Sequence, residues 1–414
     1  MKPIVYILLF VTALFLQSCT EPYALQTDTY ESALVIEASL TDEFKFQEIK
    51  LSRTYKLEED GPNPETNAIV YITDSNGNQY NFTGNGDKYI SQEEFQALPN
   101  ISYQLHVATA DGKTYTSTNE KINSLTDIDD VEAVRGVNSK GEDGVQILVK
   151  STRASNATEY YRFSYTETYK VIAPQWTPQR GTVVPIVPTP QEYPIANLVM
   201  EPWPYEAQIC YSTKDSEEIA LANTSLNTST ANVDLARFLN VTDYKIANRY
   251  SINVTMHNES LAAYNYYDAL RKSSSDENLL SQNQPGFYSG NIKNLTNPNE
   301  KIIGFFSVSH VTSKRIFFNF EDIFQNHPKP EYPYNCPLVT DENENEFKFM
   351  YCFCYGSPAC PTDPSCAGLY ILESVRIRRK AVYNYVTGFV YLVDIQCGDC
   401  TSFSSNVRPS FWID

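Results

Sequence analysis

The chain has 414 residues and is acidic, with 32 lysines and arginines against 50 aspartates and glutamates and a formal net charge of −18. This length exceeds what one ordinary domain needs and fits two. The negative charge argues against nucleic acid as a partner, because the phosphate backbone attracts basic surfaces. Aromatic residues make up 13% of the chain, which favours a packed and β-rich protein over a disordered one.

The first residues have the layout of a secretory signal. Lys2 precedes an apolar run from Ile4 to Leu16, which is too short to span a bilayer. Gln17-Ser18-Cys19 follow the run, and a small residue directly before a cysteine resembles the site cut by lipoprotein signal peptidase. We therefore expect a signal peptide over residues 1–18 and a lipid on Cys19, with acyl chains that anchor the protein in the membrane. The alternative is an ordinary signal followed by a chance cysteine.

Residues 19–32 are polar and predict a flexible tether. Short segments of alternating apolar and polar residues follow, and they predict strands at 34–40, 48–53, 68–73, 80–82, 103–107 and 115–117. Asp74 to Asn78 and Asp111 to Lys113 predict hairpin turns. The first of these also resembles the opening of a calcium loop, but it lacks the glutamate at the twelfth position. This pattern predicts an immunoglobulin-like or transthyretin-like β-sandwich over residues 33–123.

Residues 124–414 predict a larger β-rich domain with one helix and a disulfide-stapled C-terminal region. Strands are expected at 145–149, 160–165, 302–308, 315–318 and 382–386, and a helix over 259–272. Residues 174–204 hold eight prolines, so we expect a long extended loop there, because proline removes the N–H donors that a strand ladder needs.

Eight cysteines remain besides Cys19, an even number in a chain that crosses an oxidising compartment, so we expect disulfides. Eight cysteines allow 105 pairings, which the sequence cannot resolve. Zinc bound by the clustered thiolates and a redox-active Cys397-Gly398-Asp399-Cys400 pair are the alternatives. The disulfide candidates are Cys210, Cys336, Cys352, Cys354, Cys360, Cys366, Cys397 and Cys400.

Catalytic motifs are missing from the sequence. None of the histidines at 106, 257, 310 and 327 belongs to a metal-binding pair, and no nucleophile elbow, P-loop or dinucleotide fingerprint occurs. We expect no enzyme, no metal and no cofactor. An envelope hydrolase would need a free thiol near His257 or His310. Tyr332-Pro333-Tyr334 and the aromatic residues between Trp176 and Trp203 could stack on a sugar or peptide, or could pack internally.

Several short motifs occur together in this order: the Cys19 signal, Leu34-Val35-Ile36-Glu37, Ile303-Gly304-Phe305-Phe306 and Cys397-Gly398-Asp399-Cys400-Thr401. With them the chain resembles a family of Bacteroidota outer-membrane lipoproteins catalogued as a domain of unknown function, number 4249. The resemblance implies an outer-membrane lipoprotein, often encoded near TonB-dependent receptors, and carries over no catalytic residue. The dense cysteines between 352 and 366 depart from it.

Two binding functions follow as hypotheses. The first is a lipid-anchored accessory protein that binds an outer-membrane protein, such as a TonB-dependent transporter. The second is a surface protein that binds a glycan or a peptide. We expect an outer-membrane location at the cell surface, with the periplasmic face as the alternative, because Thr20-Glu21-Pro22 supplies one acidic charge after Cys19.

Overall fold

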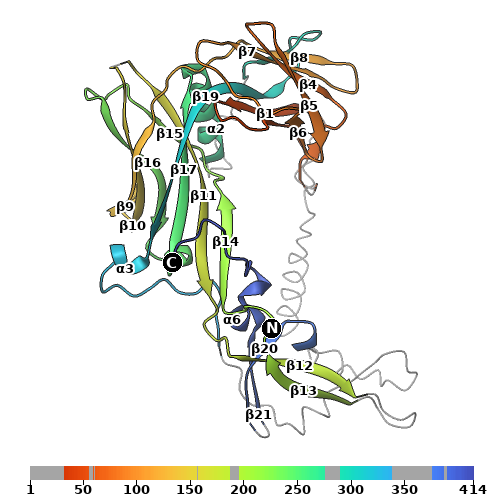
Figure 1. Ribbon diagram of the computed structural model, residues 1–414, viewed down its shortest axis with the longest axis vertical. Helices are drawn as coiled ribbons and strands as arrows, with labels where there is room; N and C mark the ends of the chain where they lie inside the picture. The colour runs from red at the N-terminus through yellow and green to blue at the C-terminus, as the bar shows by residue number, and fades with distance from the viewer. Residues whose placement is uncertain are drawn as a thin grey trace, which may run out of the picture.

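Strands account for most of the regular structure of the protein, which is elongated and has three parts along its long axis (Figure 1). The computed structural model describes residues 32–55, 59, 61–155, 157–186, 195–275, 290–337, 375–386 and 389–414. The expected mainly β fold is confirmed. Cys19 and the cysteines at 352, 354, 360 and 366 lie outside the described residues. No helix in these ranges is long and apolar enough to cross a membrane.

The N-terminal part is one curled sheet whose strands enclose a single core. Along the sheet the strand order is β19-β1-β2-β6-β5-β4-β7-β8-β18, and β3 pairs with β2. The strands within residues 34–117 are β1 (Leu34–Thr41), β2 (Glu48–Arg53), β3 (Asn63–Pro64), β4 (Ile69–Asp74), β5 (Gln79–Asn85), β6 (Lys88–Ser91), β7 (Tyr103–Ala108) and β8 (Thr114–Ser117).

Alternation along these strands puts every second side chain into the core. Leu34, Ile36 and Leu40 of β1 are buried and pack in one cluster with Val70 of β4 and Leu105 of β7. The predicted hairpin between β4 and β5 is confirmed: Gly77 has φ +89°, and the side chain of Asp74 accepts hydrogen bonds from the Asn76 and Asn78 N–H groups at 2.9 Å.

Two strands from much later in the chain complete this sheet. They are β18 (Ile292–Asn294), beside β8, and β19 (Ile302–Phe318), which runs parallel to β1 from Ile302 to Ser309. From His310 to Phe318, β19 instead pairs antiparallel with β17 (Tyr250–Glu259). The apolar segments 302–308 and 315–318, which predicted two separate strands, belong to this one strand. Polar residues interrupt the apolar pattern where the strand passes from one sheet to the next.

The central part is built from long strands around a second core, which is separate from the first. In one layer β14 (Ile209–Asp215), β11 (Tyr160–Ile172) and β17 lie side by side, with β15 (Ala220–Asn223) also on β11. The other layer is β16 (Ala231–Asn240), β10 (Asp143–Thr152) and β9 (Ile128–Val137). Two short helices, η1 (Tyr244–Ile246) and α3 (Phe320–Ile323), also belong here.

Helix α2 (Leu261–Ser275) confirms the helix predicted over 259–272. The Ser260 hydroxyl accepts a hydrogen bond from the Ala263 N–H at 3.1 Å, which is the capping interaction expected of a serine at this position. Ala263 and Tyr266 pack the helix against Phe305 of β19.

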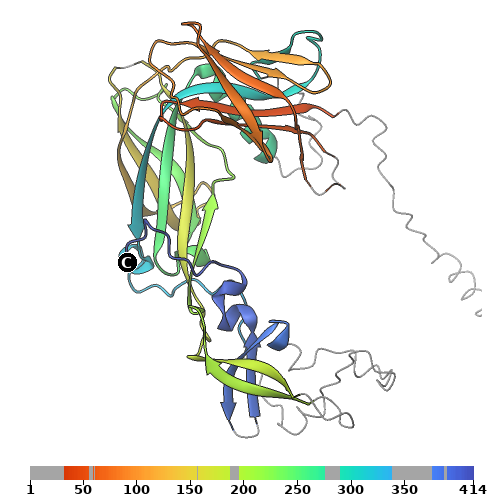
Figure 2. The same cartoon turned by 45° about the vertical axis from the view of Figure 1, so that its right-hand side comes forward.

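The third part, here called the C-terminal module, lies at the end of the molecule opposite the N-terminal sheet (Figure 2). It contains two hairpins, β12 (Gln179–Ile186) with β13 (Ile195–Pro202) and β20 (Lys380–Val386) with β21 (Phe389–Asp394). The short helices α6 (Ile395–Gly398) and η3 (Cys400–Ser402) follow.

The β12–β13 hairpin corrects the long loop expected over residues 174–204. Two of the eight prolines, Pro185 and Pro202, lie within the paired strands, opposite Ala196 and Gln179. A two-stranded ribbon has two open edges, so a proline whose missing N–H would point outwards removes no ladder hydrogen bond. The number of prolines therefore excluded a central strand but not an isolated hairpin.

Candidate ligand pocket in the C-terminal module

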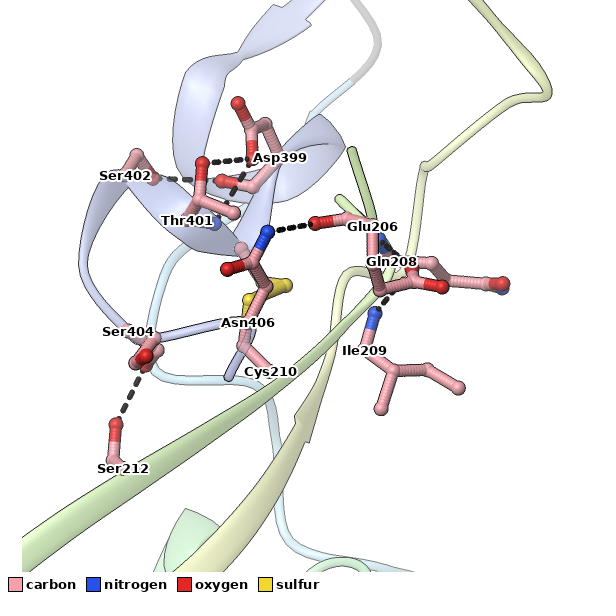
Figure 3. Close-up of a disulfide and its surroundings, with 12 residues drawn as sticks. Glu206, Gln208, Ile209, Cys210, Ser212, Asp399, Thr401, Ser402, Ser404 and Asn406 are labelled. Atoms are coloured by element: carbon pink, nitrogen blue, oxygen red, sulfur yellow. Dashed lines mark hydrogen bonds between the residues drawn. A yellow bond between two sulfur atoms is a disulfide. The ribbon is translucent and has the colours of Figure 1, made fainter. Parts of the chain in front are cut away.

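Two disulfides brace the C-terminal module, and they split the Cys397-x-x-Cys400 pair. Cys400 bonds to Cys210 on β14, and Cys397 bonds to Cys336. Figure 3 shows the first of these bridges and the polar contacts beside it. The disulfide expectation is confirmed for these four cysteines, and the alternative of a redox pair is wrong, because neither thiol bonds to the other. Both bridges tie the module to segments distant in sequence.

Asp399, between the two half-cystines, organises the local structure. Its side chain is fully buried. One carboxylate oxygen accepts hydrogen bonds from the N–H and hydroxyl groups of Thr401, at 2.9 and 2.6 Å, and thereby begins η3. The other oxygen accepts from the Tyr205 hydroxyl at 3.0 Å and from Nη2 of Arg378 at 2.6 Å. Burial, followed by the nearby charge of Asp399, raises the pKa of Tyr205.

A pocket of about 280 Å³ lies next to this carboxylate, between the two hairpins. Four cationic residues and two aromatic residues contribute to its wall: Arg180, Arg376, Arg378, Lys380, Trp203 and Tyr205. Asp399 is the acidic residue in the lining. In a chain with a net charge of −18, this concentration of positive charge distinguishes the pocket.

Close packing of the two hairpins forms the pocket wall. Gly181 faces Val382, and a Cβ at Gly181 would lie 2.2 Å from the Val382 Cγ2 atom. Gly398 makes a similar approach to Ala381, at 2.7 Å. Val375 and Val382 then form a small apolar core with residues of the β12–β13 hairpin. Glycine is needed at these two positions because a side chain would separate the layers.

Ion pairs hold the cationic side chains in place. Arg180 donates through Nε and Nη2 to Oε1 of Glu201, at 3.0 and 2.6 Å. Hydrogen bonds from Thr182 and Arg180 lower the pKa of Glu201. Lys380 Nζ lies 2.9 Å from Oδ1 of Asp394. The indole N–H of Trp203 donates to the Thr177 carbonyl at 2.9 Å, which fixes the orientation of the ring.

Tyr332, Tyr334 and Trp176, which the sequence also offered as stacking residues, contact neighbouring segments, although Tyr334 remains exposed. The Tyr332 hydroxyl donates to the Gln396 carbonyl at 2.8 Å, and the Tyr334 ring packs edge-on against Phe403. Trp176 packs against the central core. Trp203 is the aromatic residue of this set that lines the pocket.

The histidines lie elsewhere. His257 Nε2 is 3.0 Å from Oγ of Ser164, and burial together with Arg162 lowers its pKa well below the ordinary value. The buried Nδ1 atom of His257 has no hydrogen-bond partner among the described residues, so this pair lacks the carboxylate of a catalytic triad. His106 stacks on Tyr71, with 4.6 Å between ring centroids.

A metal site does not emerge from the part of the chain that the structure describes. No group of three or more histidine, cysteine, aspartate or glutamate side chains in these ranges could hold a metal ion. The cysteines at 352, 354, 360 and 366, which were considered for zinc, fall outside the described residues.

The sequence pointed to Trp203 as a possible stacking residue but not to the charged residues around it. Arg180 and Glu201 were assigned to a loop, and Asp399 was read only as part of a cysteine motif. One signal was present: Arg376, Arg378, Arg379 and Lys380 form a basic run in an acidic chain. Its partner across the pocket, the β12–β13 hairpin, is distant in sequence, so only the tertiary structure brings them together.

No curated protein matches the chain. A family model described as a domain of unknown function (DUF4249) matches residues 20–315. The match covers the N-terminal sheet, most of the central part and the β12–β13 side of the pocket, but not the β20–β21 side. The match extends over more than half of the chain, and the chain therefore belongs to the DUF4249 family.

Proposed function

We propose that this chain is a lipid-anchored outer-membrane protein that acts by binding a protein partner, such as a TonB-dependent transporter or a related assembly. The lipid on Cys19 and a cell-surface location are part of the proposal. The observation that carries it is the β12–β13 hairpin, a two-stranded ribbon at the far end of the molecule whose strands pair only with each other among the described residues. An open strand edge is a standard docking site for a partner strand.

The position of the hairpin supports this function. The described chain begins at Ser32, beside β1 of the N-terminal sheet, and the C-terminal module lies at the opposite end (Figure 1). A tether over residues 19–32 has a contour length of about 45 Å. A flexible tether of this length would let the elongated molecule tilt on its lipid anchor, so that the hairpin at its far end would reach parts of a partner that project from the membrane. Val199 on β13 is 43% exposed and presents an apolar side chain there.

The test is a pull-down of the natively lipidated protein in mild detergent, with mass spectrometry of bound proteins. We expect a stoichiometric outer-membrane protein with the wild type and its loss with Val199→Glu. Ile69→Glu is the matched control, because Ile69 is 67% exposed but lies on β4, which has a neighbour on both sides. Recovery of the lipoprotein alone would contradict the proposal. Labelled palmitate should enter the wild type and not Cys19→Ser.

The pocket favours a second function, the binding of a glycan or peptide at the cell surface. An aromatic ring and hydrogen-bond donors converge on a concave site in the braced module, which is the usual composition of a small-ligand site. A glycan array probed with the lipidated protein tests it. No signal above that of a Trp203→Ala, Arg180→Gln double variant would contradict this second function.

A further inference from the structure

We infer that the pocket of the C-terminal module binds an acidic sugar unit, that is, a sugar ring bearing one carboxylate or phosphate group. This inference rests on the second proposed function and names its ligand class. Its basis is the combination of cationic side chains with a fixed aromatic ring in one pocket of about 280 Å³, close to the lower end of the size usual for ligand sites.

The charge of the ligand follows from the donors that remain. Arg378 makes its hydrogen bonds through Nη2, to Asp399 and Thr401, so Nε and Nη1 have no partner among the described residues. Arg180 donates through Nε and Nη2 to Glu201, and its Nη1 has no partner in the part of the chain that the structure describes. Guanidinium groups with unused N–H donors bind carboxylates and phosphates in preference to neutral groups.

Arg378 is held in a conformation that favours binding. Its backbone has φ +57°, in the left-handed region that residues other than glycine rarely adopt. The hydrogen bond from its own N–H to the Val375 carbonyl, at 3.1 Å, and the ion pair with the buried Asp399 maintain this conformation. Unusual backbone conformations of this kind cluster at binding sites, where they fix a side chain before the ligand arrives.

The sugar part of the ligand follows from Trp203. Its hydrogen bond to the Thr177 carbonyl and its edge contact with Tyr205, with 5.6 Å between ring centroids, hold the indole at the pocket wall. A fixed aromatic face offers apolar area with little loss of side-chain entropy, which suits the C–H face of a sugar ring. The pocket thus combines a flat apolar face with anion-binding groups.

The test is isothermal titration calorimetry of the full-length lipidated protein in detergent, with glucuronate, glucose 6-phosphate, glucose and inorganic phosphate as probes. We expect saturable binding of one or both acidic sugars and at least about tenfold weaker binding of glucose, because a charge-assisted hydrogen bond is lost. Preference for glucuronate assigns a carboxylate ligand, and preference for glucose 6-phosphate assigns a phosphate ligand.

Variants connect the binding to this pocket. Arg180→Gln and Lys380→Gln should each weaken binding of the preferred acidic sugar by about tenfold or more. Arg135→Gln is the matched control and should leave the affinity for the acidic sugar unchanged. Arg135 also donates through Nε and Nη2 to a carboxylate, that of Asp143, but it lies in the central part, outside the pocket. Trp203→Phe, which keeps an aromatic ring, should weaken the binding of both acidic sugars without changing the affinity for inorganic phosphate.

Several results would overturn the inference. Inorganic phosphate that binds as tightly as both sugars would show a general anion patch, and unchanged affinity in both pocket variants would place binding elsewhere. If the protein binds only neutral glycans on the array, the inference of an acidic ligand is wrong, but the second proposed function stands. If it binds no glycan on the array, both are contradicted.

Discussion

The His310 imidazole forms a hydrogen bond with the carboxylate of Asp42 at the point where β19 passes from the N-terminal sheet to the central sheet. Asp127, in the segment between the two sheets, lies 3.1 Å from the other ring nitrogen. Asp42 also accepts a hydrogen bond from the Val311 N–H at 2.9 Å. One side chain thus connects three segments at the junction of the two large parts.

This junction makes stability depend on pH. The hydrogen bond with Asp42 raises the pKa of His310 above 6.5, and the contacts with His310 and Val311 lower the pKa of Asp42 below 3.8 against the opposing effect of burial. The His310 contribution is therefore complete below about pH 6.5 and disappears as the pH rises through the raised pKa. The Asp42 contribution is complete above about pH 4 and disappears as the pH falls. We expect His310→Gln to cost about 1 kcal/mol between these values and less at pH 9, measured by urea unfolding.

His106 supplies a control of opposite sign. Burial lowers the pKa of His106 below 6.5, so the folded protein favours its neutral ring and its contribution grows as the pH rises. The cost of His106→Gln should therefore be larger at pH 8 than at pH 5. Equal pH dependence in the two variants would contradict the assignment of His310 as the protonated partner of Asp42.

Removal of the Cys210–Cys400 disulfide should destabilise the protein by about 2–5 kcal/mol. The bridge closes a loop of 190 residues, whereas Cys336–Cys397 closes one of 61. The chain-entropy argument makes the longer loop worth about 1 kcal/mol more. Double serine variants of each pair, compared by thermal unfolding, measure both effects. A larger loss from the Cys336–Cys397 variant would show that native contacts, not loop entropy, dominate.

Gly304→Ala should destabilise the N-terminal sheet by about 2 kcal/mol or more. Gly304 has φ +148°, and a Cβ there would lie 2.2 Å from the carbonyl oxygen of Ile36 on the paired strand β1. Gly84→Ala is the control, because its Cβ would meet Tyr89 at an ordinary 3.6 Å. Hydrogen exchange of β1 amides in the two variants locates the effect, and similar protection in both would contradict it.

Asp399→Asn should loosen the C-terminal module at a cost of about 2 kcal/mol, because Arg378 loses its charged partner next to a buried site. Asp394→Asn, which affects the more exposed pair with Lys380, should cost less than about 1 kcal/mol. Limited proteolysis compares the two variants. Equal resistance of wild type and Asp399→Asn would show that the disulfides alone hold the module.

Local patterns in the sequence were sufficient to predict most individual elements. Alternation predicted strands such as 34–40 and 103–107, and Ser260 with the apolar residues after it predicted α2. These signals survive because each depends on neighbours within a few residues. Pairing between distant strands leaves no such signal, so the contribution of β18 and β19 to the N-terminal sheet could not be foreseen.

The sequence by itself determined the β-rich class, the acidic charge, the family and the even set of cysteines, because composition and short motifs carry this information. Only the tertiary structure decided that Cys397 and Cys400 bond to different partners, and that Arg180 and Trp203 face Arg378 across one pocket. The physical reason is distance along the chain. Disulfide pairing and the assembly of a pocket depend on which remote segments pack together, and the packing of the whole chain determines that.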